Sequence, residues 1–317
     1  MPDIDVSFPT ISLRKGDTWN NVWAIRRALH KWRPDVLVTA NFGCIEWAIA
    51  NAVPMVRHVH MEDGFGPEER TAQIPRRVWL RRLFLRRATV IVPSQTLLRI
   101  ATDIWRLPPS CLCYVPNGID LTRFNMRSTA WHTPPVIGTV AALRAEKNVG
   151  RLVRAFALLR ARRPAQLVVV GDGPEMGTLR ALAVQRGVAD WVRFNGHDPH
   201  PELAYQTFDV FALASDTEQM PLSVLEAMAT GLPIAATDVG DVRQMVAPEN
   251  ATHVVALDGP AGDDVALAAA LERLLDDPVT ARRIGAANRA RAESYYDQQR
   301  MFATHATLWR GTPVPWQ

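Results

Sequence analysis

Cysteine is scarce in this chain of 317 residues. Only Cys44, Cys111 and Cys113 are present, and an odd number cannot pair completely. The single Cys-x-Cys also lacks the second pair of ligands that a zinc site needs. The sequence therefore predicts neither a disulfide scaffold nor a zinc site, and the expected location is the reducing cytoplasm.

Long apolar runs and sequence repeats are missing as well. No stretch approaches the roughly 18 apolar residues of a membrane-spanning helix, and the first ten residues lack a basic region followed by an apolar one. We therefore expect neither a membrane span nor a secretory signal. The composition, 48% hydrophobic and 21% charged, is that of a globular protein.

Lysine is nearly absent, and charge is unevenly distributed. Arginine supplies all but three of the 36 basic residues. Up to residue 134 there are 18 basic against 11 acidic residues, whereas the remainder has 18 against 21. A basic front half and a mildly acidic back half predict two units with different partners.

Short β-branched apolar segments alternate with helical stretches along the whole chain. Examples are DVLVTANF and ATVIVPS in the front half and VIGTVAAL, QLVVVGDG and VFALAS in the back half. This alternation predicts an α/β protein with two doubly wound, Rossmann-like parallel sheets and a ligand in the cleft between them. The expected domains are 1–130 on the acceptor side, 131–295 for nucleotide binding, and a C-terminal helix and tail, 296–317, that packs back on the first domain.

The segment 215–241 carries the strongest chemical signal. A strand is followed by the loop DTEQM, and Pro221 and Gly231 mark the start and end of a helix. The free N–H groups at the start of such a helix suit an anion such as a phosphate. Glu218 and Glu226 flank this start and suit sugar hydroxyls, although two solvated surface acids would give the same pattern.

A second loop follows the strand that contains Gly138. It carries Arg144 and Lys147, a guanidinium that can bind two phosphate oxygens and a mobile point charge. An exposed Arg and Lys at a helix start is the simpler alternative. The third loop, GDGPEMG at 171–177, lacks the G-x-G-x-x-G spacing, which disfavours a nicotinamide-dependent dehydrogenase.

The ordered set PNGID, R-x-x-K-N, VVVGDGPE and E-x7-E resembles the retaining glycosyltransferases of family four (group 1), which have the GT-B fold. The resemblance covers most of 113–246. Within that family the chain is similar to sugar transferases of bacterial surface-polysaccharide pathways, including the exosortase-associated group. The resemblance implies transfer of a sugar from a nucleotide-diphosphate sugar to a hydroxyl acceptor, with retained configuration, in polysaccharide or glycolipid synthesis.

The resemblance also assigns roles to individual residues. It implies no metal and no cofactor besides the nucleotide-sugar co-substrate, so Asp3-x-Asp5 is interpreted as chance rather than as a metal motif. Glu218 would hold the donor sugar near the reacting carbon, as a catalytic residue, and Glu226 would bind the ribose. The remaining donor-binding candidates are Gly138, the diphosphate-neutralising Arg144 and Lys147, and Met220, Pro221 and Leu222, whose backbone amides approach the donor.

In the front half, RHVHMEDGFG lies where the family places a histidine in its cleft. His60, at the strand exit, is the catalytic candidate for contact with the donor sugar, and Glu62 and Asp63 are candidates for approaching the acceptor hydroxyl. A structural histidine with satisfied ring nitrogens is the alternative.

The family usually begins with a strand, a Gly-Gly loop and a helix, and we find no counterpart before residue 35. We therefore expect a shortened front domain, from a misplaced start codon or a natural truncation. The alternative function is then a module that binds a nucleotide sugar without transferring it.

The stretch 75–88 contains six arginines among Val, Trp, Leu and Phe. A basic amphipathic helix of this kind can rest on anionic lipid, which would suit a lipid-linked acceptor at the inner face of the membrane. A surface helix with one buried face is the alternative. A nucleic-acid partner is disfavoured, because aromatic stacking platforms and a uniformly basic domain are missing.

Overall fold

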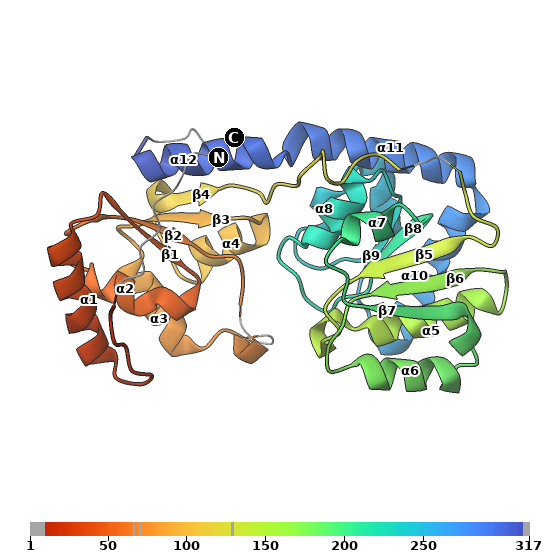
Figure 1. The fold of residues 1–317 in the computed structure, drawn as a ribbon, viewed down its shortest axis with the longest axis horizontal. Coiled ribbons are helices and arrows are strands. Elements are labelled where there is room, and N and C mark those ends of the chain that lie inside the picture. Colours follow the sequence, from red (N-terminus) through yellow and green to blue (C-terminus); the bar gives the residue numbers. More distant parts are fainter. Residues whose placement is uncertain (1–9, 66, 70–71, 128–129, 313–317) are drawn as a thin grey trace. The chain divides into compact units, whose positions relative to one another are not determined.

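The computed structural model describes residues 10–65, 67–69, 72–127 and 130–312. The chain divides into two compact units: unit 1 comprises Met1–Val115 with Thr304–Gln317, and unit 2 comprises Pro116–Ala303. Each unit is built on one parallel sheet with helices packed against it (Figure 1). The predicted α/β class is therefore confirmed.

Unit 1 has a four-stranded parallel sheet whose spatial order follows the sequence, β1-β2-β3-β4. Its largest apolar cluster contains Val90, Leu97 and the fully buried Trp105. Arg57 in β2 donates a hydrogen bond of 2.8 Å to the carbonyl of Leu308, which ties the end of the chain to this sheet. The elements are β1 (Val36–Ala40), β2 (Arg57–Met61), β3 (Thr89–Val92), β4 (Leu112–Tyr114), α1 (Thr18–Trp32), α2 (Ile45–Ala50), α3 (Pro75–Phe84), α4 (Gln95–Asp103) and, from Thr304 onward, α12 (Gln298–Arg310).

Unit 2 has a six-stranded parallel sheet in the order β10-β9-β8-β5-β6-β7. Because the chain winds one way from β5 to β7 and the other way from β8 to β10, β5 and β8 flank the point where the strand order reverses. Ligands of doubly wound sheets bind beyond the carboxyl ends of such strands. The strands are β5 (Val136–Val140), β6 (Gln166–Val170), β7 (Val192–Gly196), β8 (Val210–Leu213), β9 (Ile234–Thr237) and β10 (Val254–Val255).

Both faces of this sheet are covered, which explains its continuous apolar strands. Neighbouring strand residues alternate between two clusters: Val136 packs into one and Ile137 into the other. One cluster includes residues of α5, α6 and α10, and the other includes residues of α8 and α9. The helices are α5 (Val149–Arg160), α6 (Met176–Gln185), α7 (Pro201–Tyr205), α8 (Leu222–Ala229), α9 (Val242–Met245), α10 (Pro260–Asp276) and α11 (Pro278–Tyr295) (Figure 1).

Gly138 lies inside β5, where it pairs with Val168 and Phe211 of the neighbouring strands. A Cβ atom at this position would lie 2.1 Å from Cγ of the Phe208 ring. Phe208 is itself fully buried, so it has no room to move aside. The structure therefore gives Gly138 a packing role within the sheet, and its contact with a donor stays a prediction.

Replacing Gly138 by alanine should destabilise unit 2 by about 3 kcal/mol, because the added methyl overpacks a dense core. Urea unfolding would measure the change. The matched control is Gly177→Ala in α6, where nothing lies within 4 Å of the added Cβ. The control should be neutral or slightly stabilising, and equal stability of the two variants would contradict the packing role.

A polar layer crosses the sheet of unit 1. Oγ1 of Thr39 in β1 lies 2.8 Å from both Nε2 of His58 and Nδ1 of His60 in β2. Burial first, and the neighbouring His60 second, lower the pKa of His58 to about 4. The folded chain therefore keeps this ring neutral at pH values where an unfolded chain protonates it.

Unit 1 should consequently lose stability as the pH falls from 6.5 towards 4, because only the unfolded state then takes up the proton at His58. The loss between about pH 7 and about pH 5 should be about 2 kcal/mol from this residue. Urea unfolding of wild type and His58→Gln at both pH values measures it as the difference between the two proteins. His197→Gln, at an exposed position, is the control and should keep the wild-type pH dependence.

Candidate active site

The loops that follow β5 and β8 meet at one ion pair. Nζ of Lys147 lies 2.6 Å from Oε1 of Glu218, and the hydroxyl of Ser215 donates a bond of 2.8 Å to the same oxygen. The two charged side chains are 21% and 9% exposed, so water screens this pair only in part. The structure thus brings together two residues that lie 71 positions apart in the sequence.

The Lys147 loop is buttressed by the GDG turn after β6. The amide of Leu143 donates to the carbonyl of Asp172 at 2.9 Å. A Cβ on Gly171 would lie 1.8 Å from the oxygen of Ala141, and one on Gly173 would lie 2.5 Å from that of Leu143. These glycines, which have φ values of 135° and 157°, therefore allow two backbones to touch rather than forming a dinucleotide fingerprint.

Arg144 is not part of the Lys147–Glu218 contact. Its side chain is 54% exposed, and its Nε lies 3.0 Å from Oε1 of Glu146. Arg144 precedes the 3-10 helix Ala145–Lys147, which turns the chain into α5. Arg144 thus lies three positions before Lys147 in the sequence, and its guanidinium is held only by an exposed, weak ion pair.

The Glu218 loop is fixed from the neighbouring strand β9. The Thr237 hydroxyl donates a bond of 2.7 Å to the carbonyl of Ser215, and the amide of Asp241 donates one of 2.9 Å to that of Gln219. A Cβ on Gly240, where φ is 56°, would lie 2.5 Å from the carbonyl oxygen of Glu218. Ser215, Thr237 and Gly240 were missed by the sequence analysis, although a hydroxyl at the end of an apolar strand is a detectable signal.

A further overlooked residue, Arg151, holds the end of β8. Arg151 in α5 is 5% exposed, and it donates bonds of 2.6 Å to the carbonyl of Ala214 and 3.0 Å to Asp263. Its guanidinium also lies 2.9 Å from Asp216. Because this arginine is paired with acids on two sides, it serves to position the loop rather than to bind an anion.

The start of α8 lies directly after Glu218. Pro221 is the N-cap residue of the helix and makes no side-chain hydrogen bond to its first turn. Met220 is buried, at 5% exposed, whereas Leu222 is 52% exposed. The carbonyl of Met220 accepts a hydrogen bond of 3.4 Å from the side-chain amide of Asn117. Uncapped N–H groups at a helix start carry partial positive charge and are suited to a phosphate.

Glu226 lies one turn further into α8 and has a different partner. The Tyr205 hydroxyl donates a bond of 2.6 Å to Oε2 of Glu226. Burial raises the pKa of Glu226, and the hydrogen bond from Tyr205 partly offsets this. Burial also raises the pKa of Tyr205, which is fully buried, so it stays a neutral donor. No motif in the sequence indicated a role for Tyr205.

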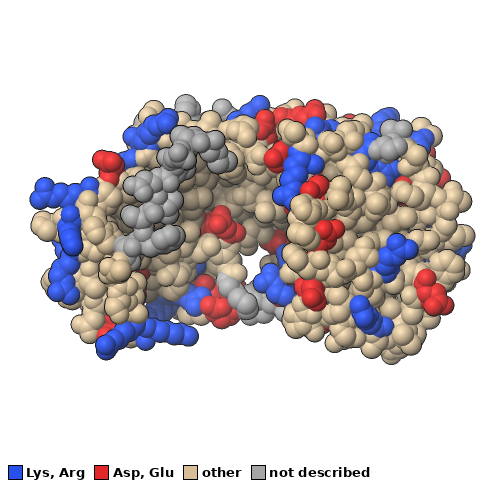
Figure 2. Space-filling view, viewed as in Figure 1, with Lys and Arg blue, Asp and Glu red and all other residues tan. Residues whose placement is uncertain are grey.

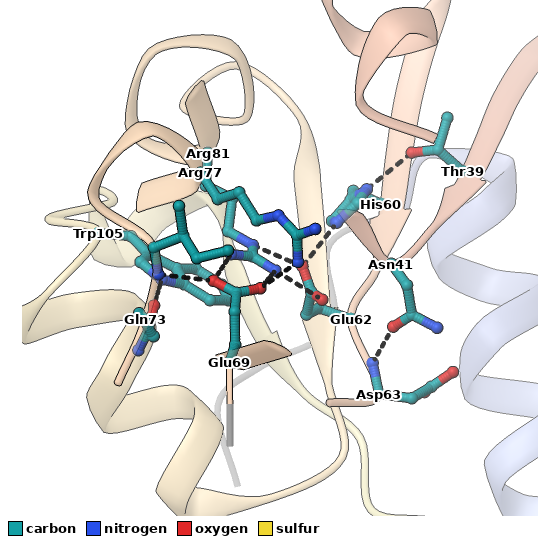
Figure 3. A network of polar contacts seen from close by, with 11 residues as sticks. Thr39, Asn41, His60, Glu62, Asp63, Glu69, Gln73, Arg77, Arg81 and Trp105 are labelled. Atoms are coloured by element: carbon teal, nitrogen blue, oxygen red, sulfur yellow. Dashed lines mark hydrogen bonds and ion pairs between the residues drawn. The ribbon is translucent and has the colours of Figure 1, made fainter. Parts of the chain in front are cut away.

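In unit 1 the predicted catalytic histidine lies within a buried network (Figure 3). His60 is 1% exposed; its Nδ1 is bonded to Thr39, and its Nε2 lies 3.3 Å from Oε2 of Glu62. If Nε2 carries the proton towards this carboxylate, Nδ1 accepts from Thr39 and Thr39 accepts from His58. Both nitrogens are then satisfied, which is the alternative that the sequence left open. Contact of His60 with a sugar stays a prediction.

The acidic residues after His60 differ in their surroundings. Glu62 is fully buried and lies 3.0 Å from Nε of Arg81, so it is committed to an ion pair. The amide of Asp63 donates a bond of 2.8 Å to the Asn41 side chain, while its carboxylate is exposed (Figure 3). Partial burial and the charge of Glu62 raise the pKa of Asp63. Of the two acids, only Asp63 is exposed.

Two of the six arginines in 75–88 point into unit 1. Arg81 is 1% exposed, contacts Glu62 and Glu69, and lies over the rings of Phe42 and Trp105 at 4.9 and 4.8 Å. Arg77 also pairs with Glu69, at 3.0 Å. The buried face of α3 is therefore partly ionic, because buried acids face it. The exposed side chains of this stretch include Arg76, Trp79, Arg82, Leu83, Arg86 and Arg87.

Among the residues that the structure describes, no group of three or more His, Cys, Asp or Glu side chains could hold a metal ion. Asp3 and Asp5 lie outside that part of the chain. Within the same part, none of the helices is both long and apolar enough to cross a membrane.

Comparison with known families agrees with this geometry. Residues 122–291 match the model of "Glycosyl transferases group 1", which spans more than half of the chain, and residues 3–123 match that of "Glycosyltransferase Family 4". The first match contains Lys147, Glu218 and Glu226 together with the loops that hold them.

Relatives with assigned names come from several bacteria. A Mycobacterium tuberculosis glycogen synthase is 29% identical over 88% of this chain and 69% of its own length. A GDP-mannose-dependent alpha-(1-6)-phosphatidylinositol monomannoside mannosyltransferase from the same species is 34% identical over 69% of this chain. That alignment spans 60% of the mannosyltransferase, which is less than two thirds.

Solved structures share the fold. Sucrose-phosphate synthase from Thermosynechococcus elongatus superposes with a TM-score of 0.76 at 21% identity, over 96% of this chain and 81% of that one. Anabaena HepE in complex with UDP gives 0.76 at 20% identity, over 90% and 81%. The chain therefore has the GT-B fold and belongs to the group 1 glycosyltransferases.

Proposed function

We propose that the chain transfers a sugar from a nucleotide-diphosphate sugar to a hydroxyl acceptor with retained configuration, in bacterial polysaccharide or glycolipid synthesis. The observation that carries this proposal is the Lys147–Glu218–Ser215 contact beside the uncapped start of α8. A cation, a carboxylate and free backbone donors at the carboxyl ends of two parallel strands suit a sugar joined to a diphosphate.

Lys147 and the first turn of α8 would stabilise negative charge that develops on the departing diphosphate. Arg144 would join them when the diphosphate, a stronger partner, replaces Glu146. The acceptor hydroxyl attacks the face from which the diphosphate leaves, and the leaving phosphate oxygen takes the hydroxyl proton. No metal or cofactor is required in this scheme, since side chains and a helix end supply the positive charge.

Donor binding would rearrange the Lys147–Glu218 pair. The ammonium of Lys147 now donates to Oε1 of Glu218 at 2.6 Å, so that oxygen is already occupied. When a phosphate draws Lys147 away, this carboxylate oxygen becomes available to accept from sugar hydroxyls. Ser215 keeps Glu218 oriented during the exchange, because its hydroxyl bonds the same oxygen.

The two ends of the donor would be held by separate carboxylates. Glu226 would accept from ribose hydroxyls, while the hydrogen bond from Tyr205 holds its Oε2. The proposal does not specify the nucleobase of the donor, because one relative is named a GDP-mannose-dependent enzyme and one structural neighbour was solved in complex with UDP.

The acceptor would be lipid-linked and reached at the inner face of the membrane. The exposed residues of α3 and the turn after it support this, since Arg76, Arg82 and Arg86 accompany the exposed Trp79 and Leu83. His60 would act within unit 1 by holding Glu62 against Arg81, and Asp63 would approach the acceptor hydroxyl.

The second candidate is a module that binds a nucleotide sugar without transferring it. The burial of His60 favours it, because a ring that is 1% exposed and already bonded to Thr39 and Glu62 is not displayed for contact with a donor sugar. Donor binding without turnover would support this alternative.

The first test is calorimetric titration with UDP, GDP and ADP. One nucleotide should bind, and Lys147→Ala should weaken it at least about tenfold, because a charge-assisted contact to phosphate is lost. Lys31→Ala, the same substitution in unit 1, is the control and should bind as wild type. No binding by folded wild-type protein would contradict the proposed donor site.

Glu218→Gln should lower turnover about a hundredfold or more while nucleotide binding persists, because Glu218 is assigned to the sugar and not to the phosphates. Sugar transfer and titration should be measured on the same samples. The control is Glu249→Gln, at an exposed position of unit 2. Unchanged turnover in Glu218→Gln would overturn the role of this residue.

Tyr205→Phe should weaken nucleotide binding about tenfold at neutral pH, since it removes a hydrogen bond to a carboxylate. The hydroxyl of Tyr205 lowers the pKa of Glu226, so its removal raises that pKa, and the affinity should fall further as the pH is lowered. Titrations at about pH 8 and about pH 6 would measure this. Tyr295→Phe, at a residue that is 59% exposed, should match wild type at both values.

A further inference from the structure

The outer face of α1 carries two neighbouring exposed tryptophans. Trp19 is 74% exposed and Trp23 is 63% exposed, and a spacing of four residues places them one above the other. The opposite face of α1 is buried through Ile25 and Leu29. The indoles are therefore not part of the core that holds this helix in place.

Basic residues continue the same stripe. Arg27 and Lys31 follow Trp23 at intervals of four and lie on the exposed side of α1. Within the described part of the chain, neither side chain has a carboxylate within ion-pair distance. Figure 2 shows Lys and Arg side chains gathered along the left edge, where Figure 1 places α1.

A hollow lies beside these residues. It has a volume of about 550 Å³ and is lined by residues that include Arg14, Asn20, Trp23 and Arg27. The acid that also lines it, Asp17, is bonded at 2.9 Å by the Asn20 amide. Two guanidinium groups and an indole around one hollow are suited to a phosphodiester, because arginine binds phosphate oxygens as a fork.

We propose that the outer face of α1, with the loop 12–17 before it, docks on an anionic lipid surface. The indoles of Trp19 and Trp23 lie at the level of the headgroups, where amphipathic rings are favoured. Arg14, Arg27 and Lys31 contact lipid phosphates, and the hollow takes one headgroup. Charge complementarity selects this occupant, since an anionic leaflet attracts clustered basic residues, and Arg27 and Lys31 have no ion-pair partner among the residues that the structure describes.

This surface is separate from the exposed face of α3 and does not depend on the transferase assignment. Vesicle binding and nucleotide binding are measured independently, so either can fail alone. A nucleic acid is the competing polyanion. If it were the true partner, the chain would bind DNA more strongly than vesicles of equal charge.

Flotation of the full chain with vesicles tests the proposal. Wild type should float with vesicles of roughly one third phosphatidylglycerol and not with pure phosphatidylcholine, and salt should weaken the binding. The triple variant Trp19→Gln, Trp23→Gln, Arg27→Glu should bind anionic vesicles about tenfold or more weakly. Circular dichroism would establish that the variant is folded.

Two controls make the result specific. Val184→Gln with Arg186→Glu changes an exposed apolar and an exposed basic residue in unit 2 and should float as wild type. The variant Trp79→Gln with Arg82→Glu measures how much the exposed face of α3 contributes to vesicle binding. Wild-type flotation by the α1 variant, loss of flotation in the α3 variant alone, or preferential binding of wild type to a DNA oligonucleotide would each overturn the α1 proposal.

Discussion

The contact between Lys147 and Glu218 depends on one constraint, that β5 and β8 are parallel neighbours in the middle of a sheet. Their exit loops must leave from the same edge, and the chain between these two residues, which lie 71 positions apart, is folded into elements that bring them together. Almost every other feature of the site supports this pair. Arg151 fixes the end of β8, the GDG turn fixes the loop after β5, and Thr237 with Gly240 fixes the loop that carries Glu218.

The sheets and most of the unit 2 site could be predicted because their signals are local. Short β-branched runs identify strands, and Pro221 and Gly231 frame α8, so Glu218 and the helix start could be placed together. The anchors could not be found in this way. Thr237 and Gly240 act on Ser215 and Glu218, which lie about twenty residues earlier, and Tyr205 reaches Glu226 from α7. Such contacts depend on strand order, which no local pattern specifies.

Unit 1 shows where residue type alone misleads. The arginines of 75–88 predict a basic amphipathic helix with its arginines free to meet lipid, yet Arg77 and Arg81 meet Glu62 and Glu69 inside the unit. The same buried carboxylate lies beside His60. His60 does lie near the end of β2, at a strand exit, whereas its surroundings depend on Arg81, from a helix that follows about twenty residues later.

The glycines at 171 and 173 have a consequence for how such an enzyme diversifies. Every other amino acid has a Cβ, which would collide with the carbonyl oxygen of Ala141 or Leu143, so the path of the Lys147 loop cannot drift through substitution at these positions. A change of donor preference must then arise from side chains displayed on an unchanged backbone. Lineages that exchange one sugar or base for another are expected to vary around a loop whose course stays the same.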